Sequence, residues 1–84
     1  MNITNTLWNG FKDLGPWSGS CNVMTTPWTR FLSRPGTEGS PGGDYNVYVL
    51  GGQFGVMQVA IYYTGNELKI RANYNGTWQN WASF

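Results

Sequence analysis

Residues 64–78 read TGNELKIRANYNGTW, and this stretch predicts the fold. Its middle part alternates apolar and polar side chains, with Leu68, Ile70, Ala72 and Tyr74 on one face and Glu67, Lys69, Arg71 and Asn73 on the other. Such alternation is typical of a half-buried β-strand. Gly65-Asn66 suits a two-residue type II′ turn before this strand, and Asn75-Gly76 suits a type I′ turn after it. The stretch therefore predicts a strand between two hairpin turns, with the apolar face buried and the polar face in water.

Two further strands are predicted upstream of this stretch. Residues 45–50 alternate β-branched and aromatic side chains and end at Gly51-Gly52, and residues 54–63 form a second run that is apolar on both faces. A strand that is apolar on both faces is expected at the centre of a sheet or at a subunit contact. Residues 45–84 are therefore expected to form an antiparallel β-meander.

The first 44 residues carry weaker signals. Leu7, Trp8, Phe11 and Leu14 fall at helical spacing, so residues 1–17 are predicted to be a short helix or an irregular lead-in. Residues 18–44 are predicted to be irregular, with a short strand at 21–24 and a loop at 33–44 that holds four Gly and two Pro. The expected architecture is one small, mainly β domain over residues 1–84, with a short helical or irregular N-terminal segment.

Length and composition exclude several classes of protein. The chain has 84 residues, five Lys and Arg, four Asp and Glu, and 17% aromatic residues. An aromatic-rich chain with so few charges is unlike a disordered region, and a net charge of +1 does not provide the basic stripe of a duplex-binding protein. No apolar run approaches the ~20 residues of a membrane span, and no signal-peptide pattern opens the sequence. We therefore expect neither nucleic acid as a partner nor membrane insertion.

Catalytic and metal-binding chemistry is not indicated. The chain has no histidine and a single cysteine, Cys21, which lacks neighbours that would activate a thiolate. The four carboxylates, Asp13, Glu38, Asp44 and Glu67, suggest no pair held across a cleft. The sequence predicts a protein that is not an enzyme and that uses neither a metal nor a cofactor.

The segment from Asp44 to Phe84 resembles the pyocin-knob-like module of bacteriophage tail fibres and phage-tail-like bacteriocins. The resemblance rests on the short strand, the Gly-Gly break, the long strand 53–63, the Gly-Asn turn, and Asn75-Gly76-Thr77-Trp78 with Trp81 three residues later. It implies a non-catalytic β module of a homotrimeric fibre, made in the bacterial cytoplasm and located in the virion. It also implies contacts with other tail or fibre proteins near the receptor-binding end. The family supplies no ligand residues that can be transferred.

Aromatic and polar residues near the C-terminal turn form a candidate glycan site. Trp78, Trp81 and Tyr74 offer ring faces on which a sugar can stack, while Asn75 and Arg71 can hydrogen-bond its hydroxyl groups. Residues 78 and 81 would point to opposite faces of an extended strand, so at least one Trp is expected in the core or at an interface. Arg71 can instead be interpreted as a solvated surface charge. Trp8, Trp17 and Trp28 are expected to be core or subunit-contact residues rather than ligand-binding ones.

The predicted function is that of a trimeric tail-fibre or receptor-binding module that attaches to a host cell-surface polysaccharide or glycan by avidity. Two alternatives stay open. The first is a purely structural spacer or trimerisation knob with no ligand site of its own. The second is a binder of single-stranded nucleic acid that stacks bases beside Arg71 and Lys69, which a net charge of +1 disfavours.

Overall fold

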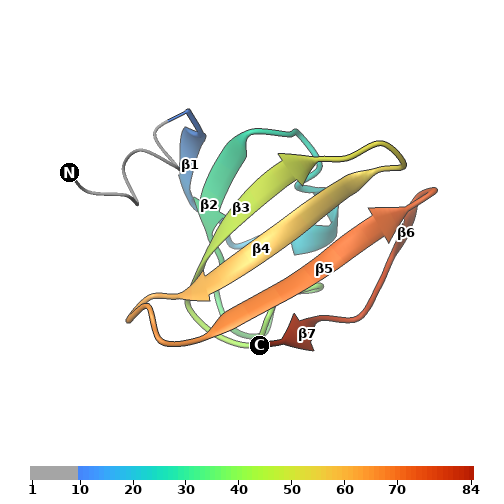
Figure 1. Cartoon of the computed structure of the whole chain (residues 1–84). Helices are drawn as coiled ribbons and strands as arrows, with labels where there is room; N and C mark the ends of the chain where they lie inside the picture. The colour runs from blue at the N-terminus through green and yellow to red at the C-terminus, as the bar shows by residue number, and fades with distance from the viewer. Residues whose placement is uncertain (1–9) are drawn as a thin grey trace.

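The computed structural model describes residues 10–84, which form one sheet with a short 3₁₀ helix beside it (Figure 1). The elements are β1 (Lys12–Pro16), η1 (Cys21–Val23), β2 (Thr29–Leu32), β3 (Tyr45–Gly51), β4 (Val56–Tyr62), β5 (Leu68–Tyr74), β6 (Thr77–Trp78) and β7 (Ala82–Ser83). The strand order is β1-β2-β3-β4-β5-β6, and β7 pairs with β5. Every pairing except that of β1 with β2 is antiparallel, so the prediction of a small antiparallel β domain is confirmed.

One of the two predicted hairpin turns is confirmed and the other is wrong. Asn75 and Gly76 both take positive φ, 52° and 87°, as a type I′ turn requires. The connection between β4 and β5 is not a two-residue turn: it spans residues 63–67, and the Tyr62 amide donates to the Glu67 carbonyl. Gly65 closes this loop with a φ of 83°, and its amide donates to the Tyr62 carbonyl.

The N-terminal half contains two strands, β1 and β2, within residues 1–44, which were predicted to be helical or irregular. Residues 1–9, with most of the expected helical turn, lie outside the described residues, and Lys12–Pro16 is a strand rather than a helix. It pairs in parallel with β2, and the Lys12 amide donates to the Trp28 carbonyl. The strand expected at 21–24 is instead η1, because the Ser20 side chain accepts a hydrogen bond from the Asn22 amide and caps the turn.

The core lies on one face of the sheet. Phe31, Val47 and Ala60 are register neighbours on β2, β3 and β4, and all three are buried. The segments 17–28, which includes η1, and 33–44 cover this face, and Figure 1 shows them behind the sheet. Cys21 of η1 packs into the same cluster. We call the face of the sheet that carries this core the covered face, and the opposite face the open face.

The predicted orientation of β5 is wrong. Arg71, expected on a solvated polar face, is only 5% exposed, whereas Leu68, Ile70 and Ala72 on the opposite face are only partly buried. The covering segments present backbone carbonyls, which need donors, and Lys69 Nζ donates to the Pro41 carbonyl at 2.6 Å. The polar side of β5 is therefore the side that faces the interior.

Burial of Cys21 predicts an inert thiol. The residue is fully buried, and burial raises the pKa of the thiol above its ordinary value, which the hydrogen bond with Thr37 and the charge of Arg71 partly oppose. Because the reactive species is the exposed thiolate, we expect Cys21 to react with a soluble disulfide reagent only as fast as the protein opens. Rapid labelling of the native protein, compared with labelling in denaturant, would contradict this burial.

Candidate binding site on the open face of the sheet

Three of the five sequence-predicted site residues form a cluster in which Arg71 is buried and Trp78 and Trp81 are partly buried. The Arg71 guanidinium carbon lies 4.1 Å from the ring centroid of Trp78 and 4.7 Å from that of Trp81. The expectation that the two Trp residues point to opposite faces is wrong, because β6 ends at Trp78 and the chain then leaves the strand. Both rings contact the same cation, and such cation–π contacts stabilise a desolvated guanidinium.

Hydrogen bonds hold this cluster against the covering segments. Arg71 Nε donates to Gln58 Oε1 at 2.9 Å, and Gln58 Nε2 donates to the carbonyls of Cys21 and Met24. The two indole N–H groups donate to carbonyls as well, Trp78 to Asn22 and Trp81 to Gly39. Burial lowers the pKa of Arg71, against a smaller opposing effect of Cys21. These residues join the sheet to its cover, and both indole N–H groups are used within the protein.

Tyr74 and Asn75, the other two predicted site residues, are exposed at the hairpin between β5 and β6. Tyr74 packs against Phe54, with ring centroids 6.1 Å apart, beside a mostly apolar pocket of about 210 Å³. The structure thus separates Tyr74 and Asn75, which solvent reaches, from the Arg71 cluster.

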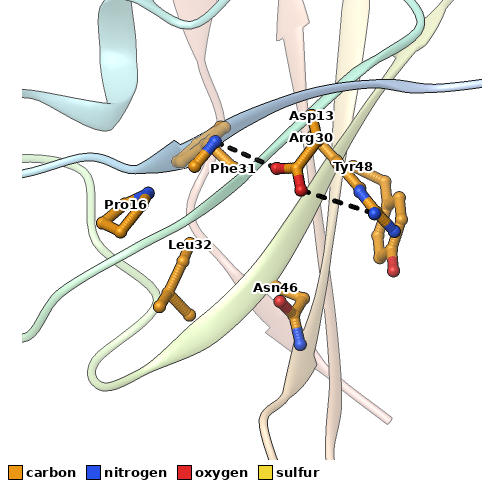
Figure 2. A pocket seen from close by; sticks show the side chains of 8 residues that line it. Asp13, Pro16, Arg30, Phe31, Leu32, Asn46 and Tyr48 are labelled. Atoms are coloured by element: carbon orange, nitrogen blue, oxygen red, sulfur yellow. Dashed lines mark hydrogen bonds and ion pairs between the residues drawn. The ribbon is translucent and has the colours of Figure 1, made fainter.

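A polar hollow lies elsewhere, over β1, β2 and β3 on the open face (Figure 2). It has a volume of about 340 Å³, at the lower end of the range for small-molecule sites. Arg30 and Tyr48 are register partners, and so are Leu32 and Asn46, so these four side chains share one face. Asp13 joins them because β1 pairs with β2, placing it opposite Arg30. We call the set Asp13, Arg30, Asn46 and Tyr48 the polar hollow.

The charges of the polar hollow cancel. Arg30 Nη2 lies 3.4 Å from Asp13 Oδ2, and Asp13 Oδ1 accepts a hydrogen bond from the Gly15 amide at 2.9 Å. Figure 2 shows these two interactions and the Asn46 side chain at the other end of the hollow. Both charged side chains are partly exposed. The hollow therefore presents acceptors, donors and an amide without a net charge.

Three aromatic residues, Tyr48, Phe11 and Trp28, form a row that leads from the polar hollow to the protein surface. Phe11 packs edge-on against Tyr48 at 5.4 Å between centroids and against Trp28 at 5.8 Å. Trp28 is 56% exposed, so it is not a core residue, which was one of the two roles expected for it from the sequence. Its φ of 66° lies in the left-handed region, which is costly for a bulky residue and is concentrated at functional sites. An exposed Trp held in such a backbone conformation is available to stack on a ligand.

Sequence reasoning missed these residues for a physical reason. Asp13 and Arg30 are 17 positions apart in the sequence and come together only because β1 pairs with β2 in parallel. No local sequence pattern predicts this pairing. Asn46 and Tyr48 lie on a predicted strand, and their shared face was readable from the two-residue period. The strands that pair with it could not be predicted from the sequence.

Two absences within residues 10–84 bear on other kinds of site. No helix among them has the length and hydropathy needed to cross a bilayer. Nor does this part of the chain hold a group of three or more His, Cys, Asp or Glu side chains placed to bind a metal ion.

Comparison of the chain with protein-family models, with curated proteins and with solved structures gives no match. The function must therefore be inferred from the chain's own residues and geometry.

Proposed function

We propose that this chain is a receptor-binding module of a bacteriophage tail fibre, acting in the virion as a homotrimer that attaches to a host-surface glycan. The observation that carries the proposal is the polar hollow, which Phe11 connects to the exposed Trp28. The proposed ligand site is the hollow and its aromatic row, because Arg71 is buried and the rings of Trp78 and Trp81 pack against its guanidinium.

The chemistry of the hollow favours a neutral saccharide. Sugar hydroxyls donate and accept hydrogen bonds, and the hollow offers a carboxylate acceptor in Asp13, a guanidinium donor in Arg30 and an amide with both functions in Asn46. The pairing of Asp13 with Arg30 removes the net charge that would select an anion or a cation. Exposed Trp28 supplies a ring face for the apolar side of a pyranose.

A shallow site of this size needs more than one copy to hold a cell. Three copies on one fibre turn the second and third binding events into intramolecular ones, which multiplies the overall affinity. A surface polysaccharide, with its repeated units, is a ligand that all three sites can engage at once.

The test is binding to an array of bacterial surface polysaccharides, followed by titration of the strongest binder with variants. Asn46→Ala and Trp28→Ala should each weaken binding about tenfold or more, since each removes a hydrogen-bonding or stacking group worth about 1.4 kcal/mol. Phe84→Ala is the matched control, because Phe84 is an exposed aromatic residue on β7's side of the sheet, away from the hollow. It should bind as the wild type does.

Two results would contradict this proposal. Binding that survives both substitutions but is lost in Tyr74→Ala would move the site to the β5–β6 hairpin. Absence of binding to every polysaccharide, by a protein that is folded and trimeric, would favour a second function.

The second candidate is a structural spacer or trimerisation knob without a ligand site. It is favoured by the apolar side chains that β4 and β5 leave on the open face, which suit contact between subunits. The two functions differ in the polysaccharide assay and not in their oligomeric state.

A further inference from the structure

A band of apolar side chains runs along the open face of β4 and β5. The register pairs Met57 with Ala72, Val59 with Ile70 and Ile61 with Leu68, so all six side chains lie on the face away from the core. We call these six residues the apolar strip. None of them is buried, and Met57 is 36% exposed.

No described segment covers the apolar strip. The segments 17–28 and 33–44 both lie on the covered face, and the front of β4 and β5 is clear in Figure 1. At one end the strip continues into the pocket formed by Phe54 and Tyr74, both exposed, together with Met57 and Ala72. A continuous apolar surface of this kind on a small protein is typical of an interaction site.

We propose that copies of this chain pack against one another through the apolar strip. This inference rests on the proposed fibre module and names the surface by which its subunits associate. The strip contains no charged residue, so it offers nothing to select a charged partner and meets no repulsion from a second strip. The whole chain carries a net charge of only +1, so copies repel one another weakly.

The size of the strip fits the centre of a subunit interface. With strands about 4.8 Å apart and about 3.4 Å per residue, the seven-residue strands β4 and β5 present roughly 230 Å² in projection. Side chains around this centre, among them Leu50, Phe54 and Tyr74, extend it toward the roughly 600 Å² per partner of a small stable interface. An apolar centre with a more polar rim is the usual anatomy of such contacts.

Burial of the apolar strip between subunits would also stabilise the fold. Within residues 10–84 the core cluster holds only six buried residues, and Phe31 is the largest side chain among the fully buried ones. Small domains with thin cores commonly rely on association to bury more apolar surface. Packing through β4 and β5 would leave the polar hollow, which lies over β1–β3, beside the contact and open to a ligand.

The experiment measures the solution mass of the full chain by light scattering over a range of concentrations, with a double variant, Met57→Lys with Ile61→Lys. The wild type should show three times 9.4 kDa, and the double variant should shift to 9.4 kDa, with association weakened roughly 100-fold or more because each contact would bury unpaired ammonium groups. Val23→Lys is the matched control, since Val23 is an exposed apolar residue on the covered side.

Circular dichroism at low concentration shows whether the variants are folded. If the double variant is unfolded, Met57→Lys alone replaces it, because this exposed side chain can keep its charge in water. A wild-type monomer at all concentrations, or a folded variant that keeps the wild-type mass, would overturn the proposal. A dimer that the substitutions dissociate would support the strip and contradict the trimer. A wild-type trimer that the substitutions dissociate but that binds no polysaccharide would support the strip and count against the hollow alone.

Discussion

Arg71→Ala is expected to destabilise the protein by about 2–4 kcal/mol, a large share of the stability of a chain of this size. The substitution leaves Gln58 Oε1 buried without its donor and opens a void between the rings of Trp78 and Trp81. It also removes two cation–π contacts from a desolvated site. Chemical denaturation followed by tryptophan fluorescence measures the loss.

Arg34→Ala is the matched control for this experiment. Arg34 pairs with Asp44 at 3.6 Å, and both side chains are close to half exposed. Exposed ion pairs contribute about 0–1 kcal/mol, so this variant should unfold almost as the wild type does. Equal stability of the two variants would show that the Arg71 cluster does not connect the sheet to its cover.

Gly55→Ala should be nearly as damaging, for a steric reason. Gly55 ends the connection between β3 and β4, with a φ of 152°, and a β-carbon at this position would overlap the Asn73 carbonyl oxygen of β5. Because the obstacle is backbone, either the hairpin or β5 must move. We expect a loss of about 3 kcal/mol or more in the free energy of unfolding.

Gly65→Ala separates this collision from simple backbone strain. Gly65 also has positive φ, 83°, but a β-carbon added to it would meet no atom within 4 Å. Alanine there should cost about 1 kcal/mol. If both variants lose the same stability, the close approach of Gly55 to β5 is not a constraint on the fold.

The sheet could be predicted from the sequence because its strands carry local signals. The alternation around Ile70 and the Asn75-Gly76 dipeptide specify a strand and its turn without reference to the rest of the chain. β1 carries no such pattern, since Lys12–Pro16 includes Gly15 and Pro16, and only its pairing with β2 makes it a strand. The direction in which β5 faces was not readable either, because apolar side chains usually mark the interior.

The surroundings of the predicted site residues could not be predicted from the sequence either. A Trp-rich segment beside an Arg indicates either a ligand platform or an interior contact, and the choice depends on what lies above it. Here the carbonyls of Asn22 and Gly39, far away in sequence, accept the two indole N–H groups. Asp13 and Arg30 likewise meet only through tertiary pairing. Periodicity does not report such long-range contacts.

The bonds that close the covered face also set an order of events during synthesis. Trp78 bonds to Asn22 across 56 positions, and Trp81 bonds to Gly39 across 42. Contacts of such sequence separation form late and slow the folding of a chain. When only the first half of the chain has been synthesised, the covering segments are present but the Trp residues that bond to them are not. We therefore expect the nascent chain to remain accessible to chaperones and proteases until Trp81 has left the ribosome.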